Sequence, residues 1–169
     1  PSERTPFVTY ALIAINVVVF VWQYGVLHDV SSSNLFLYDY AFWPILFNGG
    51  EGYTGFFTHM FLHGGIMHLA GNMLFLWIFG DNMEDEMGHV PFLVFYILSG
   101  LAAAYIQYMF EPLSRIPMVG ASGAIAGVMG GYLLMFPKAR VDIFIFFIIF
   151  FRILPIPSFI VLGVWMALQ

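Results

Sequence analysis

Residues 119–131 read Val-Gly-Ala-Ser-Gly-Ala-Ile-Ala-Gly-Val-Met-Gly-Gly, a run of small and apolar residues with a single hydroxyl, that of Ser122. Gly123, Gly127 and Gly131 recur every four residues, so on a helix they form one bare face. Such a face lets a neighbouring helix approach to backbone contact. The stretch therefore predicts an inner helix of a helical bundle.

This predicted helix is too short to cross a bilayer unaided. From Ser122 to Phe136 it has about fifteen residues, roughly 22 Å at 1.5 Å per residue, against about 30 Å of hydrocarbon. If the polar segment 137–140 lies at one membrane surface, Ser122 must lie below the other. We therefore expect a serine within the membrane, at the positive end of a helix dipole, where backbone N–H groups can stabilise an oxyanion.

The composition predicts a polytopic membrane protein. Of 169 residues, 61% are hydrophobic and 9% charged, and the mean hydropathy is +0.88, which excludes an ordinary soluble domain. The net charge of −5 is spread over loops, so we expect the lipid bilayer as a partner and no nucleic acid. The chain has no cysteine, which excludes disulfides, thiolate catalysis and cysteine metal sites.

Hydropathy predicts five spans in an all-α transmembrane bundle, a single membrane domain over residues 1–169. The predicted spans are residues 6–24, 56–79, 90–110, 122–136 and 155–169. The aromatic-rich connection 27–58 is expected to be an ordered loop in the membrane interface. Residues 141–151 are apolar but too few to span, so we interpret them as a membrane-embedded connector.

Lysine and arginine predict the orientation of these spans. Five spans place Arg4, Lys138, Arg140 and Arg152 on one side of the membrane and Arg115 alone on the other. Because positive loops stay in the cytoplasm, the N-terminus should be cytoplasmic. The end of the bundle that carries Ser122 should then open to the external or luminal side.

His68 and Asn72 are candidates for a polar site at membrane depth. They are four residues apart, so they share one face of the second predicted span. Counted along a straight helix from Phe56, His68 is roughly 18 Å in, at a depth similar to that of Ser122. Polar groups at that depth form either a buried hydrogen-bonded cluster or a functional site, and spacing alone leaves both interpretations open.

A metal site is the weaker interpretation of the histidines. His59, His63 and His68 lie on one segment, but the helical zinc-protease pattern His-Glu-x-x-His requires an acid that residues 63–68 lack. We therefore expect no metal, and we expect His59 and His63 to anchor loop backbone.

Glu84 and Gly88 are predicted to be structural. A carboxylate near a helix end can accept backbone N–H groups, and a glycine four residues later suits a tight turn.

Several motifs, taken together in their order, resemble the rhomboid family of intramembrane serine proteases. They are His63-Gly-Gly-Ile-Met-His68 with Asn72, then Gly80, Glu84, Gly88, Tyr96 and Gly100, then the GxSG motif of residues 120–123. The match runs from about Phe56 to Arg140. The resemblance implies that Ser122 is the nucleophile, that His68 and Asn72 form an oxyanion hole with backbone around Gly120 and Gly123, and that transmembrane proteins are cleaved without cofactor or metal.

One part of the family pattern is missing. The resemblance implies a sixth span that carries the general-base histidine, yet none of the five histidines follows the fifth predicted span. We expect that span and its histidine to lie beyond Gln169, so the domain would be C-terminally incomplete. Two alternatives remain: a non-proteolytic relative that binds transmembrane clients, and a channel or transporter component.

Overall fold

The computed structural model describes residues 5–26, 30–138, 140–147 and 150–167. The chain divides into two compact units, Pro1–Val128 and Met129–Gln169, and each is described by itself. Most described residues are helical, as predicted. The helices are α1 (Phe7–Val26), α2 (Val30–Tyr40), α3 (Pro44–Asn48), α4 (Tyr53–Thr58), the 3-10 helix η1 (His59–Phe61), α5 (Ile66–Met87), α6 (His89–Phe110), α7 (Ser122–Met135) and α8 (Ser158–Ala167).

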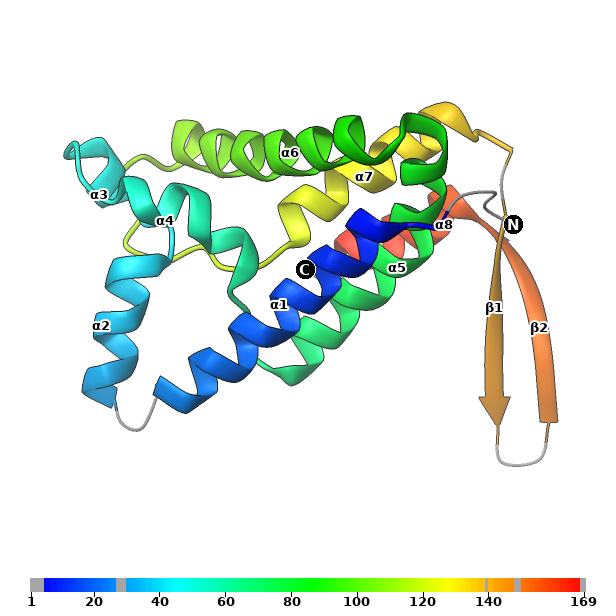
Figure 1. The fold of residues 1–169 in the computed structure, drawn as a ribbon, viewed down its shortest axis with the longest axis horizontal. Coiled ribbons are helices and arrows are strands. Elements are labelled where there is room, and N and C mark those ends of the chain that lie inside the picture. Colours follow the sequence, from blue (N-terminus) through cyan, green and yellow to red (C-terminus); the bar gives the residue numbers. More distant parts are fainter. Residues whose placement is uncertain (1–4, 27–29, 139, 148–149, 168–169) are drawn as a thin grey trace. The chain divides into compact units, whose positions relative to one another are not determined.

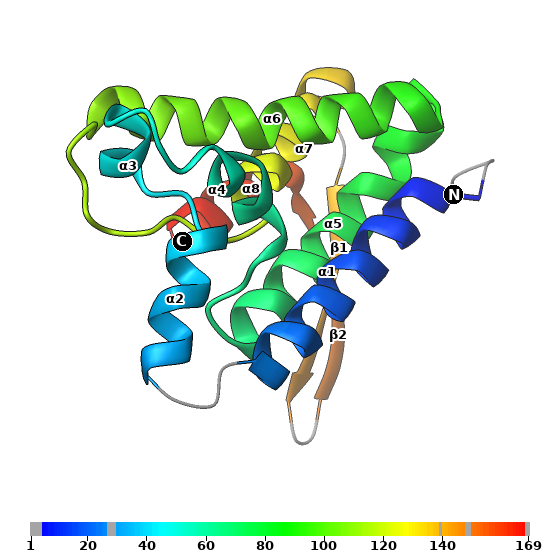
Figure 2. The ribbon, with the colours of Figure 1, turned by 60° about the vertical axis from the view of Figure 1, so that its left-hand side comes forward.

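Helices α1 and α5 lie side by side and run in opposite directions (Figures 1 and 2). Their contact is close, since a Cβ added at Gly80 of α5 would lie 3.1 Å from the Thr9 hydroxyl of α1. Glu84 near the end of α5 binds the start of α1, and Gln23 near the end of α1 binds the backbone of His63, in the break before α5. The packing of α1 against α5 thus fixes the position of α5, including its first turn.

The second predicted span, residues 56–79, is wrong as a straight helix. The chain forms α4 and η1, leaves helical conformation at Leu62–Gly65, and resumes in α5 with a bend of 78°. Two consecutive glycines, weak helix formers, lie at the break, and the side chain of Gln23 bonds the backbone of His63 there. Helix α5 then continues to Met87, eight residues beyond the end of the predicted span at residue 79.

The connection between α1 and α5 is ordered in its described part, as predicted. It carries α2, α3 and α4, and its buried core contains Phe36, Ala41 and Leu62. Phe42 forms an antiparallel bridge with Met118, each donating its N–H to the carbonyl of the other, at 3.1 and 2.8 Å. This bridge ties the connection to the segment that leads into α7.

Helices α6 and α7 pack through small residues, which confirms the predicted bare face for Gly123 and Gly127. A Cβ added at Gly123 would lie 2.5 Å from the Cβ of Ala103, and one at Gly127 would overlap the side chain of Ser99. Gly131, the third glycine of the series, belongs to the second unit.

The second unit contains a β-hairpin where an apolar connector was predicted, so the all-α prediction is wrong there. Strands β1 (Arg140–Phe147) and β2 (Phe150–Pro157) pair antiparallel, from Arg140 opposite Pro157 to Phe147 opposite Phe150. The physical reason is composition: Ile, Val and Phe favour strands, and Pro155 and Pro157 exclude a helix interior. Helix α8 contacts both strands.

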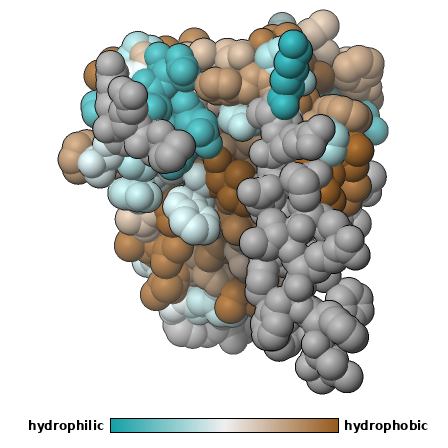
Figure 3. Space-filling model, turned by 90° about the vertical axis from the view of Figure 1, so that its right-hand side faces the viewer, coloured by the Kyte–Doolittle hydropathy of each residue, from teal (hydrophilic) through white to brown (hydrophobic). Residues whose placement is uncertain are grey.

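Two helices of the described chain, Phe7–Gly25 and His89–Phe110, are long and apolar enough to cross a membrane, and the bent pair Tyr53–Phe61 with Ile66–Met87 would be a third. Hydrophobic residues cover broad areas of the face drawn in Figure 3. Helix α7 is apolar but shorter, as predicted. The total of five spans stays a prediction.

Candidate active site

Ser122 is the first residue of α7 and is half-buried. Just before it, Gly120 has φ +124°, a conformation that residues with a side chain rarely adopt. The first bond within the helix runs from the Ile125 N–H to the Ala121 carbonyl, at 2.9 Å. The N–H groups of Ser122 and Gly123 therefore belong to the first turn, where helix N–H groups have no acceptor within the helix.

The backbone before Ser122 is fixed by residues far away in the sequence. Gly120 donates its N–H to the carbonyl of His59, at 2.9 Å. The His59 ring is buried, and its Nδ1 lies 3.1 and 3.0 Å from the carbonyl oxygens of Gly55 and Phe56. The His59 ring thus anchors backbone. Because the Gly120 N–H already donates to His59, Gly120 contributes to the site only by its small size, which allows other groups to approach closely.

His68 and Ser122 meet at Gly120. A Cβ built on Gly120 would lie 2.9 Å from His68 Nε2, 2.8 Å from His68 Cε1 and 3.7 Å from Ser122 Oγ. The imidazole and the hydroxyl therefore both lie within 4 Å of one point, which is kept free because residue 120 has no side chain. The structure thus brings His68 and Ser122 close to each other, and their depth in a membrane stays a prediction.

The position of His68 along its helix differs from the prediction. His68 lies in the first turn of α5, three residues after the Gly65 cap, instead of twelve residues along a straight helix. Its Nδ1 accepts the N–H of Gly64, at 3.3 Å. A neutral imidazole carries one proton, so when Nδ1 accepts, the proton is on Nε2. Nε2–H is then a donor at the point beside Gly120.

Asn72 follows His68 by one helical turn and is completely buried. Neither its amide nitrogen nor its amide oxygen has a hydrogen-bond partner within the described residues. Leaving a buried polar group unpaired costs about 1–3 kcal/mol. The unpaired Asn72 amide is therefore available to bind a polar group of a ligand.

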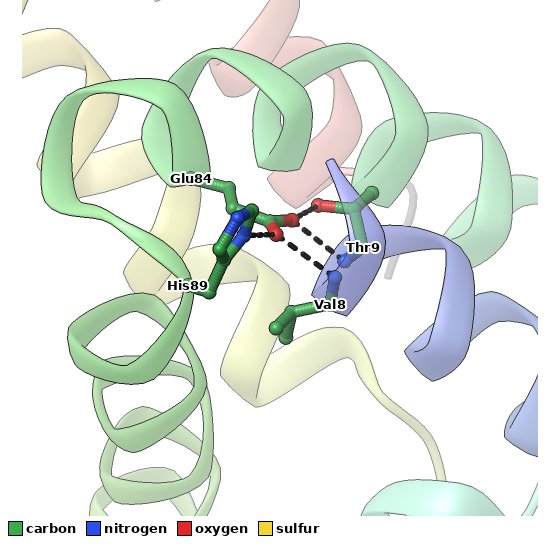
Figure 4. Close-up of polar contacts among 4 residues, drawn as sticks. All are labelled: Val8, Thr9, Glu84 and His89. Atoms are coloured by element: carbon green, nitrogen blue, oxygen red, sulfur yellow. Dashed lines mark hydrogen bonds and ion pairs between the residues drawn. The ribbon is translucent and has the colours of Figure 1, made fainter. Parts of the chain in front are cut away.

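Glu84 lies at the opposite end of α5 from His68, and Figure 4 shows its carboxylate beside Val8, Thr9 and His89. Its carboxylate accepts the N–H groups of Val8 and Thr9, at 2.8 and 2.7 Å, the Thr9 hydroxyl at 2.7 Å, and His89 Nδ1 at 2.5 Å. It therefore occupies the N-terminus of α1, where anions are favourable. Gly88, with φ +83°, ends α5 and begins the turn to α6.

Sequence reasoning did not single out Gln23, Thr9 or His89, which make polar contacts in the structure. The available signal was position: Gln23 and Thr9 are polar residues near the two ends of an apolar span, where an unexplained polar side chain usually faces the bundle. Both are buried in the structure.

Comparison with known proteins finds one family and several relatives. The Rhomboid domain matches residues 50–169. Rhomboid protein 1, mitochondrial, of Saccharomyces cerevisiae is 32% identical over 94% of this chain and 41% of its own length. Rhomboid protease GluP of Bacillus subtilis is 41% identical over 45% of this chain and 14% of its own length. Presenilin-associated rhomboid-like protein A, mitochondrial, of Danio rerio is 31% identical over 49% of this chain and 22% of its own length. The chain thus spans less than half the length of these relatives.

Proposed function

The chain belongs to the rhomboid family of membrane proteins, and from this premise we propose that it is the core of an intramembrane serine endopeptidase. In this proposal the substrates are transmembrane proteins, Ser122 is the nucleophile, and His68, Asn72 and the backbone N–H groups of Ser122 and Gly123 bind the oxyanion. The observation that carries it is the shared point beside Gly120, within 4 Å of both His68 Nε2 and Ser122 Oγ.

The chemistry follows from the types of group at that point. Ser122 Oγ attacks the scissile carbonyl carbon while its proton passes to a general base, and the carbonyl oxygen becomes an oxyanion. That oxygen accepts hydrogen bonds from His68 Nε2–H, the unpaired Asn72 amide and the N–H groups of the first turn of α7. Removal of one such donor typically lowers the rate by a factor of about 10²–10³. The amine leaves with the proton from the base, and water then resolves the acyl-enzyme to a carboxylic acid.

The general base in this proposal is a histidine outside these 169 residues. An unassisted serine hydroxyl is a weak nucleophile. We do not assign this role to Lys138, because it lies sixteen residues after Ser122 in the sequence and beyond the end of α7. Proton transfer therefore has to be measured in the full-length protein.

We also propose the orientation predicted from the charges. With Arg115 alone on one side and Lys138 and Arg140 on the other, the N-terminus is cytoplasmic and the site opens to the external or luminal side. Substrates that are themselves membrane-embedded would reach it from the bilayer.

The test is covalent labelling of the full-length protein with a fluorophosphonate, together with cleavage of a transmembrane substrate library in proteoliposomes. Ser122→Ala should abolish both, while Ser114→Ala, a serine of the loop before α7, should leave both unchanged. Cleavage that persists in Ser122→Ala would overturn the assignment. Wild-type protein that neither labels nor cleaves would favour the non-proteolytic, client-binding alternative.

A further inference from the structure

The break between η1 and α5 leaves backbone groups that need partners. Leu62–Gly65 lie outside any helix, and within a membrane every backbone N–H and C=O must be satisfied by protein. At His63 both groups are bound by one side chain from α1. The Gln23 amide donates to the His63 carbonyl at 2.9 Å, and the His63 N–H donates to Gln23 Oε1 at 3.3 Å.

This pairing requires a glutamine's particular combination of groups. A side chain that serves both the N–H and the C=O of one residue must carry a donor and an acceptor. Ionised glutamate lacks the donor, methionine lacks a strong donor and acceptor, and asparagine is one methylene shorter. Gln23 is 6% exposed, so water does not replace a missing partner readily.

The residue after His63 is the one that contacts the candidate site. The Gly64 N–H donates to His68 Nδ1 at 3.3 Å, and the other nitrogen of that ring lies at the point beside Gly120. The direction of the Gly64 N–H is set by the peptide unit that begins at the His63 carbonyl, the carbonyl that Gln23 binds. A connected path thus runs from α1 to the ring of His68.

We propose that Gln23 is a positioning residue for His68: by holding the His63 backbone, it keeps the Gly64 N–H on Nδ1 and thereby keeps the proton of the neutral ring on Nε2, facing Ser122. Without Gln23, the peptide between His63 and Gly64 is free to rotate and Nδ1 loses its donor. Both tautomers then become populated, and one of them presents Nε2 as an acceptor that cannot stabilise an oxyanion. The catalytic consequence rests on the proposed function, whereas the tautomer does not.

The direct measurement is the tautomer of His68 in full-length protein labelled with ¹⁵N-histidine in micelles, read from two-bond ¹⁵N–¹H correlations. The His68 signals are assigned by their loss in His68→Gln. We expect wild-type His68 to be protonated on Nε2 in its neutral form. A neutral ring protonated on Nδ1 in the wild-type protein would overturn the proposal without any variant.

Two variants test the role of Gln23. Gln23→Met keeps the unbranched shape without the amide, and Gln23→Asn keeps the amide but is one methylene shorter. Both should give mixed His68 tautomers and a fall of about 100-fold in kcat, the size expected from misplacing a catalytic group by about 1 Å, with KM within about twofold. The matched control is Gln107→Leu on α6, where Gln107 is exposed and bonds Glu111; it should leave the tautomer and kcat unchanged.

The two proposals fail in different ways. If Gln23→Met or Gln23→Asn retains a single Nε2–H tautomer, Gln23 does not position the ring, whatever the activity. If the tautomer changes but wild-type protein shows no cleavage that depends on Ser122, the proposed protease function fails and the positioning stands. Far-UV circular dichroism of each variant separates either result from loss of fold.

Discussion

The contact between Glu84 and the start of α1 gives the sharpest prediction of stability. Glu84 is 1% exposed. One carboxylate oxygen accepts the Val8 N–H and His89 Nδ1, and the other accepts the Thr9 N–H and the Thr9 hydroxyl. Both oxygens thus face a backbone N–H of the first turn of α1.

In Glu84→Gln an NH₂ group replaces one oxygen, so one of the two N–H groups meets a donor and loses its acceptor. A hydrogen bond to a charged group contributes about 1.5–3 kcal/mol, and the negative charge at a helix N-terminus contributes about 0.3–1 kcal/mol more. We therefore expect Glu84→Gln to lower the free energy of unfolding by about 3 kcal/mol. Glu84→Ala removes both acceptors and should cost about 4–5 kcal/mol.

The assay is equilibrium unfolding of the purified protein in mixed micelles of dodecylmaltoside and SDS, followed by far-UV circular dichroism. Glu86→Gln is the matched control, because Glu86 is an exposed carboxylate two residues further along α5 and should change stability by less than about 0.5 kcal/mol. If Glu84→Gln and Glu86→Gln unfold at the same SDS fraction, the reasoning from the four contacts is refuted.

Two further predictions concern the glycines around Ser122. Gly127→Ala places a methyl group on the side chain of Ser99 and should destabilise the protein by about 1–3 kcal/mol; in the same unfolding assay Ser99→Gly should restore most of that loss, and strictly additive effects would contradict the contact. Gly120→Ala combines φ +124° with a Cβ 2.8 Å from His68 Cε1, so fluorophosphonate labelling should disappear with helix content retained. Gly130→Ala, whose methyl group meets nothing within 4 Å, should label normally, and equal labelling of the two variants would disprove the shared point.

The candidate site shows which features can be predicted from neighbouring residues in the sequence. Ser122 was identified from its place among glycines, and His68 from its spacing to Asn72, because motifs and helical periodicity are properties of neighbouring residues. The prediction of a straight helix up to His68 was wrong because the chain breaks before α5, where Gln23, forty residues earlier in the sequence, binds the His63 backbone.

The hairpin 140–157 is a second case in which hydropathy alone was insufficient. An apolar run indicates burial or contact with lipid, yet it does not distinguish a short helix from a strand when the run has no periodicity. Strand pairing is decided by a partner segment, which for β1 is β2. The two prolines of β2 were the signal in the sequence, because proline disfavours a helix interior.

By itself, the sequence determined what depends on neighbouring residues: the apolar helices, the bare glycine face of α7, the short length of that helix, and the serine at its start. Only the tertiary structure decided what depends on distant residues. Gln23 satisfies the backbone at the break, Glu84 accepts the first N–H groups of α1, and His68 Nε2 reaches the space beside Gly120. The physical reason is that, inside a membrane, each backbone N–H and C=O needs a partner, and Gln23 and Glu84 supply such partners from another helix.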